Sequence, residues 1–357
     1  MKHEAGLFSP QFAIDQRKVR VAIAATCNLH CSYCDQGLTR TNSKMGAMED
    51  FRSTNMHEGV IPVQEYLRSL EALRESGYNG VTFTGGEPLL NPHWPELVSG
   101  SKEIGFENVR LTTNGLLLST YIRKNGKLPD ALDLLTVSLD TFDDAEFHRV
   151  TGGHVTKVLE GLELVMHTNP ELPIKANKVV MRSNLSNISD YLVLCDKHPA
   201  INQLTLLNLV CKDPLDEKER EFFSDEFVPP AEIMETLADL GLAFTVDSKH
   251  EYVTTTDSGL IINLMDTTQT LRSAICESCP IYCQEGLFTT RIATDGTIRS
   301  CGDFHNRLPY FRSTELGDAA LRLSIRELLS STSQEAVLSD TLAGFCEQYD
   351  LQPVRTK

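Results

Sequence analysis

Short runs of apolar and β-branched residues alternate with longer segments of helical periodicity between residues 19 and 210. In the helical segments, apolar residues recur three to four positions apart. Six runs predict strands, at Val19–Ala25, Gly80–Thr84, Asn108–Thr112, Leu134–Leu139, Ile174–Val180 and Gln203–Val210. Helices are predicted between them, at Pro62–Ser76, Trp94–Ile104, Val155–His167 and Ile188–Lys197. This alternation is typical of parallel strands joined by helices.

The pattern predicts an α/β fold, a partial (β/α)6 barrel of the TIM type followed by a smaller domain. After Val210 the segment KDPLDEKEREFFSDEFVPP is charged and ends in proline, which indicates an acidic connection or an exposed helix. A helix at Ala231–Leu240, a β segment at Ala243–Asp247 and a closing helix at Leu323–Leu329 are predicted beyond it. We expect an extension at residues 1–18, the barrel at 19–221 and the carboxyl-terminal domain at 222–357.

Composition narrows the function classes. The 357 residues are 41% hydrophobic and 23% charged, as in ordinary globular proteins. A formal net charge of -16 argues against general binding to nucleic acid, which depends on Lys and Arg at phosphates. The first residues contain no apolar signal region, and no run approaches the roughly 18 apolar residues of a membrane span. We expect a cytoplasmic protein without nucleic-acid or membrane partners.

Seven of the ten cysteines fall into two groups, with Cys195, Cys211 and Cys346 standing alone as expected core residues. In a reducing compartment, grouped cysteines more often bind metal or perform redox chemistry than form disulfides. The first group is Cys27, Cys31 and Cys34, directly after the first predicted strand. Three thiolates in one loop suit an iron-sulfur cluster or zinc. Zinc normally takes four ligands, and no fourth Cys or His stands at the spacing of a zinc finger, although His30 is close.

The first group resembles the signature of the radical S-adenosylmethionine (SAM) superfamily, which is C-x3-C-x2-C with an aromatic residue, here Tyr33, before the third cysteine. The resemblance implies a [4Fe-4S] cluster with one iron open to SAM, reductive cleavage of SAM to a 5'-deoxyadenosyl radical, and contact of Tyr33 with the adenine. TGGEP after the second strand resembles the motif that receives the methionine ammonium. Gly85 and Gly86 would permit close backbone approach and Glu87 would accept from the ammonium.

Further cofactor residues are implied by the same resemblance. Candidates for binding the cofactor are Thr113 and Asn114 in TTNG after the third strand, Ser138 and Asn177 for the ribose, and Arg182 for the carboxylate. Each of them could instead be an ordinary polar residue that other parts of the chain satisfy.

The second cysteine group is Cys276, Cys279, Cys283 and Cys301, with the turn Asp295–Gly296 indicating a hairpin before the last of them. Four thiolates would suit zinc or a second cluster. The group resembles the auxiliary-cluster domains called twitch or SPASM, and more closely the short twitch form. The resemblance implies a second [4Fe-4S] cluster, with three or four of these cysteines as ligands.

The chain contains FHRVTGG (Phe147 to Gly153), IKANKVVMRSN (Ile174 to Asn184) and a late C-x2-C. Through these segments the sequence is similar, over nearly the whole chain, to the GTP cyclases of molybdenum cofactor biosynthesis. That family has an arginine just before its first cysteine and another on its sixth strand. On our alignment this chain has Thr26 and Thr205 at those two positions. The late arginine pair of the family becomes Thr289 and Arg291. Because Lys175 and Arg291 are then the retained cations, we expect them to orient a less phosphorylated substrate, such as a nucleoside, sugar or aminocyclitol. Hydrogen abstraction would lead to dehydrogenation, decarboxylation or cyclisation.

Three alternatives stay open at this point, namely a GTP cyclase, a maturase of ribosomal peptides, and a non-catalytic zinc or cluster protein. The expected partners are a small-molecule substrate and a reductase such as flavodoxin or ferredoxin.

Overall fold

A twelve-stranded sheet forms the centre of the protein. The computed structural model describes residues 18–34, 60–197, 200–210, 217–246, 252–266, 269–273, 289–300, 310–332 and 336–340. Six neighbouring strands are parallel and follow one another in chain order. They are β1 (Lys18–Ala22), β2 (Gly80–Thr84), β3 (Asn108–Thr113), β4 (Leu134–Ser138), β5 (Ile174–Val180) and β6 (Ile201–Asn208). The described strands run from one edge to another without closing, so they form an open barrel.

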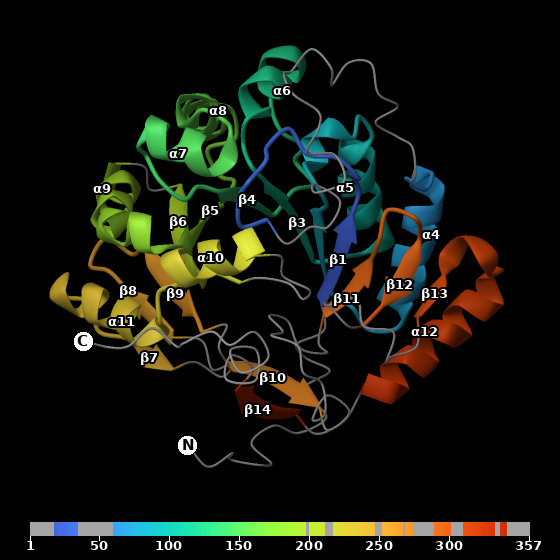
Figure 1. Ribbon diagram of the computed structural model, residues 1–357. Coiled ribbons are helices and arrows are strands. Elements are labelled where there is room, and N and C mark those ends of the chain that lie inside the picture. Colours follow the sequence, from blue (N-terminus) through green and yellow to red (C-terminus); the bar gives the residue numbers. More distant parts are fainter. Residues whose placement is uncertain are drawn as a thin grey trace.

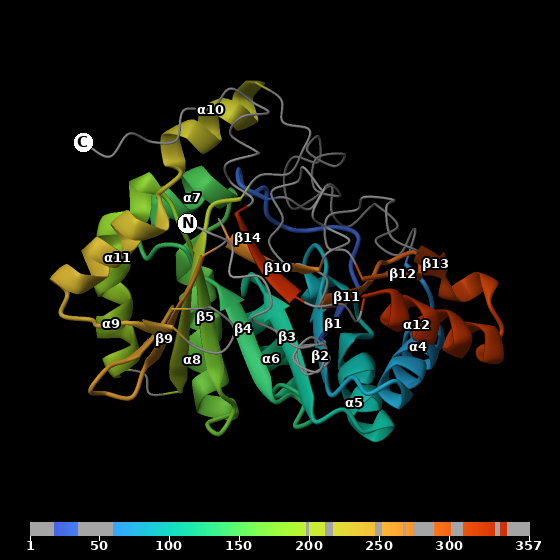
Figure 2. The same ribbon diagram turned by 90° about the horizontal axis from the view of Figure 1, so that it is seen from below.

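Helices cover one face of these strands, as Figure 2 shows for α4, α5, α6 and α8. The helices between the parallel strands are α4 (Val63–Glu75), α5 (Trp94–Ile104), α6 (Leu118–Asn125), α7 (Asp144–Thr151), α8 (Val155–Thr168) and α9 (Ile188–Lys197), with one-turn and two-turn 3-10 helices η1 (Pro88–Leu90) and η2 (Arg182–Asn187). We call the other face of the sheet the inner face.

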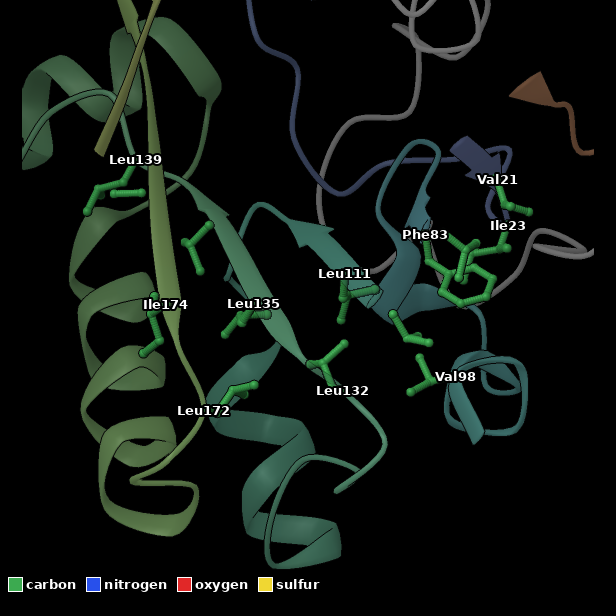
Figure 3. Close-up of a cluster of buried hydrophobic side chains, with 14 of the residues drawn as sticks. Val21, Ile23, Phe83, Val98, Leu111, Leu132, Leu135, Leu139, Leu172 and Ile174 are labelled. Carbon is green, nitrogen blue, oxygen red and sulfur yellow. The ribbon is translucent and has the colours of Figure 1, made fainter. Parts of the chain in front are cut away.

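The hydrophobic core lies between the sheet and these helices. Alternate strand residues such as Val21, Phe83, Leu111 and Leu135 are fully buried there (Figure 3). Their neighbours in sequence therefore point to the inner face, because successive side chains on a strand alternate between faces.

The carboxyl-terminal part extends the same sheet at both edges (Figure 1). Beside β6 lie β9 (Ile261–Met265), β8 (Tyr252–Thr255) and β7 (Thr245–Val246), and beside β1 lie β11 (Thr289–Ile292), β12 (Thr297–Arg299) and β13 (Tyr310–Arg312). A second sheet pairs β10 (Gln269–Ser273) with β14 (Ala336–Asp340). The remaining helices are α10 (Glu217–Glu226), α11 (Pro230–Asp239), η4 (Ser313–Glu315) and α12 (Asp318–Thr332).

The predicted α/β class is confirmed, and the six predicted strands coincide with β1 to β6 to within a few residues. The acidic segment contains α10, and the expected hairpin is β11 and β12 with Gly296 at a φ of 80° in its turn. The sequence did not predict α6 and α7, each only eight residues long. The boundary at residue 222 stays a prediction. No helix of the described residues is long and apolar enough to cross a membrane.

Candidate functional site

The loop that follows β1 carries Cys27, Cys31 and Cys34, all as free thiols. Main-chain hydrogen bonds fix this cysteine loop against the end of α7, because His30 N donates to Thr151 O at 2.8 Å and Ser32 N donates to Val150 O at 2.9 Å. Cys34 N donates to Cys31 O at 3.0 Å, closing a turn that holds two of the thiols near each other. The loop lies at the carboxyl ends of the parallel strands, where barrels of this type carry their chemistry.

The TGGEP loop after β2 packs directly on the cysteine loop. Gly86 N donates to Ala24 O, and Glu87 N donates to Thr26 O, both at 2.8 Å. A Cβ atom on Gly86 would lie 2.0 Å from Thr26 O, and one on Gly85, whose φ is 139°, would lie 2.6 Å from Ala24 O. The two glycines therefore let the two loops touch. Their close approach to the cofactor, which the sequence analysis expects, stays a prediction.

Glu87 is fully buried and joins the TGGEP loop to the loop after β3. Its Oε1 accepts hydrogen bonds from Leu89 N at 2.9 Å and from Thr113 Oγ1 at 2.6 Å. Its Oε2 accepts from Asn114 N at 2.8 Å. Burial raises the pKa of the Glu87 carboxyl to about 7. Glu87 as acceptor for the methionine ammonium stays a prediction, and Thr113 serves here as a partner of that carboxyl.

Asn114 connects the loop after β3 to the first cysteine. Its Nδ2 lies 2.7 Å from Asn28 Oδ1 and 3.6 Å from Cys27 Sγ, so it donates toward the thiol. Its Oδ1 accepts from Leu116 N at 3.0 Å, which fixes the orientation of the amide. Asn114 was predicted as a cofactor residue; the structure places it beside Cys27, and its role at the cofactor stays a prediction.

Tyr33 reaches across to β4 and to α10. Its hydroxyl donates to Asp140 Oδ2, just beyond the end of β4. Its ring packs against a hydrophobic cluster of Leu209, Val210, Phe223 and Phe227. Burial raises the pKa of the Tyr33 phenol well above its usual value, and the negative Asp140 adds to the effect, so the phenol keeps its proton.

Cys27, Cys31 and Cys34 could hold an iron-sulfur cluster. Among the described residues, no three His, Cys, Asp or Glu side chains converge closely enough to bind one metal ion. In a [4Fe-4S] cluster each thiolate binds a different iron, so the sulfurs need not converge. Burial raises the pKa of the Cys27 thiol to about 12 and that of Cys31 well above its usual value, and bound cationic iron would reverse this penalty.

The other predicted cofactor residues lie on β4, β5 and η2. Ser138 and Asn177 are paired neighbours on the inner face, and Asn177 Oδ1 is buried without a hydrogen-bond partner. Arg182 forms an ion pair with Glu232 of α11, and its Nη2 lies 3.3 Å from Phe227 O. The role of Arg182 at the cofactor carboxylate stays a prediction. Cys276, Cys279, Cys283 and Cys301 lie outside the described residues.

Lys175 and Arg291 also project from the inner face, and they are not the only cations there. Arg291 is paired with Arg20 on β1 and with Arg299 on β12. Arg20 is paired with Thr82, which is paired in turn with Arg110 on β3. We call Arg20, Arg110, Arg291 and Arg299 the cationic row. Its arginines come from β12, β11, β1 and β3, with Thr82 of β2 between the last two, and Lys175 lies on β5 opposite Thr136. The inner face therefore holds more cations than our sequence alignment counted.

Sequence reasoning missed two residues that organise this site. Asp140 is the last residue of the sequence VSLD, Val137 to Asp140, at the end of β4. Nothing in the sequence pattern showed that it accepts a hydrogen bond from Tyr33. Lys178 occupies a core-facing position of β5, where its side chain is fully buried and its Nζ donates to Asp140 O at 2.6 Å. A lysine in the apolar phase of a strand was a signal that could have drawn attention to this residue.

Comparisons with known proteins agree with this arrangement. The model of the Radical SAM superfamily matches residues 21–181. A probable GTP 3',8-cyclase of Methanococcus aeolicus is 33% identical over 214 residues, covering 58% of this chain and 64% of that protein. A GTP 3',8-cyclase of Clostridium botulinum is 25% identical over 288 residues, covering 79% of this chain and 80% of that one. The chain thus spans less than two thirds of the Methanococcus relative.

Solved structures share the fold. Streptococcus suis SuiB bound to S-adenosylmethionine superimposes with a TM-score of 0.51 at 15% identity, covering 84% of this chain and 63% of that one. Native anSMEcpe with bound AdoMet and the Cp18Cys peptide gives a TM-score of 0.52 at 14% identity, covering 89% and 84%. At these identities the likeness establishes the fold alone.

Proposed function

Residues 21–181 form a radical SAM domain, and from this premise we propose that the chain binds SAM and abstracts hydrogen from a phosphorylated nucleoside, with GTP as the first candidate. Cys27, Cys31 and Cys34 would hold the cluster. When bound, that cluster supplies the electron for cleavage of SAM. Residues of the chain would hold the cysteine loop and the TGGEP loop together, fix Tyr33 through its hydrogen bond to Asp140, and present cations to the substrate.

The observation that carries the proposal is the contact among four loops at the carboxyl ends of β1 to β4. The cysteine loop touches the TGGEP loop through Gly86. It touches the loop after β3 through Asn114 and the end of β4 through Tyr33. Motifs that lie far apart in the sequence thus meet around three free thiols, as a site for one cofactor requires.

The cationic row favours a more negative substrate than the sequence had suggested. Guanidinium groups bind phosphate in a two-pronged geometry, and Arg20, Arg291 and Arg299 lie side by side on three paired strands. Residues that the alignment matched to arginines, such as Thr26 and Thr205, carry no charge, but other positions on the inner face do. The named activity of the relatives, GTP 3',8-cyclase, supports the same choice.

Two further parts of the proposal concern electrons. We expect a second [4Fe-4S] cluster on Cys276, Cys279, Cys283 and Cys301, because four cysteines at these spacings suit such a cluster. We also expect a reductase of the flavodoxin or ferredoxin type to supply the electron.

The test is an anaerobic assay of reconstituted, reduced protein with SAM and GTP. We expect 5'-deoxyadenosine together with a cyclised guanine nucleotide, both measured by mass spectrometry. Arg20→Gln should raise the KM for GTP at least tenfold, since one arginine contact to phosphate is lost. The exposed Arg123, whose side chain pairs with Glu160, gives the matched control Arg123→Gln, which should behave like the wild type.

Two results would contradict the proposal. Absence of 5'-deoxyadenosine under strongly reducing conditions, with or without substrate, would reject the radical SAM activity. If uncharged sugars or aminocyclitols but not GTP stimulated the formation of 5'-deoxyadenosine, the phosphorylated substrate would be rejected. The less phosphorylated substrate expected from the sequence would then be favoured.

A further inference from the structure

Four small polar side chains lie in one line across the inner face. Ser138 on β4 is paired with Asn177 on β5, which is paired with Thr205 on β6, and Thr205 is paired with Asn263 on β9. We call these residues the polar row. Their neighbours in sequence, apart from the buried Lys178, belong to the hydrophobic core on the other face. Because branched apolar residues usually fill the interior of parallel barrels, a line of amides and hydroxyls there needs another explanation.

Two oxygen atoms of the polar row are buried and have no hydrogen-bond partner in the structure, namely Asn177 Oδ1 and Thr205 Oγ1. They come from residues directly opposite each other on β5 and β6, and Thr205 is only 5% exposed. Most buried polar groups in proteins do have a partner. Two neighbouring exceptions on the same face indicate a ligand that supplies the missing hydrogen bonds.

The chemistry of the polar row selects the kind of ligand group. The row carries no charge, and its amides and hydroxyls can both donate and accept. Neutral hydroxyls are the natural partners of such a surface, whereas a phosphate would favour the cations nearby. Lys175 precedes Asn177 by two residues on the same face of β5, about 7 Å along the strand. A sugar phosphate can therefore place its hydroxyls at the polar row and its anionic end toward Lys175.

We propose that Thr205 and Asn263, beside Asn177, form a subsite for the vicinal hydroxyls of a ribose. This rests on the proposed function, since it assigns the sugar of the phosphorylated nucleoside to the polar row and its anionic end to the side of Lys175. Ribose could come from the substrate or from SAM, and both carry the same pair of hydroxyls. The subsite gives Thr205 a role in specificity, through a hydroxyl that selects ribose over deoxyribose.

The experiment measures binding to anaerobically reconstituted protein by calorimetry, with SAM, GTP and 2'-deoxyGTP as probes. The variants are Thr205→Val, which keeps the shape and removes the hydroxyl, and Asn263→Ala. Thr254→Val on β8 is the control, because Thr254 is paired with the core residue Ile262 and lies away from the polar row. Wild-type protein should bind GTP at least fivefold more tightly than 2'-deoxyGTP. In Thr205→Val this preference should fall to within twofold, with SAM affinity unchanged.

A second measurement separates this role from a structural one. Replacing an unpaired buried hydroxyl by a methyl group does not remove a hydrogen bond, so the melting temperature of ligand-free Thr205→Val should equal or exceed that of the wild type. A hydroxyl needed for folding would instead lower it, and that result would overturn the proposal.

The remaining outcomes are also decisive. Loss of SAM affinity in Thr205→Val and Asn263→Ala, with GTP affinity retained, supports the ribose subsite and assigns it to the cofactor. If wild-type protein binds SAM but neither nucleotide, the phosphorylated substrate is rejected. The subsite is then tested only by comparing the SAM affinity of the variants with that of the wild type. Unchanged affinity of both variants for every probe that the wild type binds overturns the subsite.

Discussion

The hydroxyl of Tyr33 donates to the carboxylate of Asp140, 107 residues further along the chain. The other carboxylate oxygen of Asp140 accepts from Val179 N at 2.8 Å, and the Asp140 carbonyl accepts from the Lys178 ammonium at 2.6 Å. Asp140 is 3% exposed. Through this one residue the cysteine loop is tied to both β4 and β5.

Tyr33→Phe should therefore weaken the cysteine loop. The substitution keeps the ring but leaves a buried carboxylate oxygen without its donor, at a cost of about 1–3 kcal/mol. We expect faster loss of iron to a chelator and a lower urea midpoint. Tyr310→Phe is the control, because Tyr310 is 56% exposed. Equal rates of iron loss in Tyr33→Phe and wild-type protein would show that the hydrogen bond does not hold the loop.

Gly86→Ala should prevent correct packing of the two loops. The new methyl group would lie 2.0 Å from Thr26 O, so backbone must move, and overpacking of this kind typically costs about 1–3 kcal/mol. Reconstitution should give clearly less iron at the first site. Gly80→Ala, at the start of β2 and with its nearest atoms at 3.7 Å, should load normally. Normal iron content in Gly86→Ala would contradict the contact seen here.

Lys178 should make stability depend on pH. Burial lowers the pKa of its ammonium to about 8, whereas the unfolded chain keeps its ordinary higher value. Between about pH 8 and 10 the unfolded state then binds more protons, so the free energy of unfolding rises with pH. Lys178→Met lacks this rise. Between pH 7 and pH 10 the free energy of unfolding of the wild type should therefore rise by on the order of 3 kcal/mol more than that of Lys178→Met. Parallel pH profiles in urea titrations would refute the shift.

Iron counting tests the second cluster. Reconstituted protein should contain about eight irons per chain. Replacement of Cys27, Cys31 and Cys34 by Ala should leave about four, and replacement of the later group, Cys276, Cys279, Cys283 and Cys301, should also leave about four. One zinc per chain beside four irons would reject the second cluster while keeping the first.

Local patterns predicted the strands well because each carries its own alternation of apolar residues, as Ile174–Val180 does. They also placed the cysteines and TGGEP at strand ends. They could not show that Asn114 donates toward Cys27, or that Glu87 accepts hydrogen bonds from Thr113 and Asn114, because such contacts join loops from different strands. The pairing of Arg20 with Arg291 was equally hidden, since register between distant strands leaves no local pattern.

The pairing of β1 with β11 has a consequence for synthesis. β1 leads into the cysteine loop, and its neighbour on one side is β2, while on the other side Lys18 pairs with Thr289. At 5–20 residues per second, the roughly 200 residues between β2 and β11 take on the order of 10–40 seconds to translate. During that time one edge of β1 has no partner, and exposed strand edges invite association with other chains. The nascent chain therefore exposes this edge of β1, next to the cysteine loop, until β11 emerges from the ribosome.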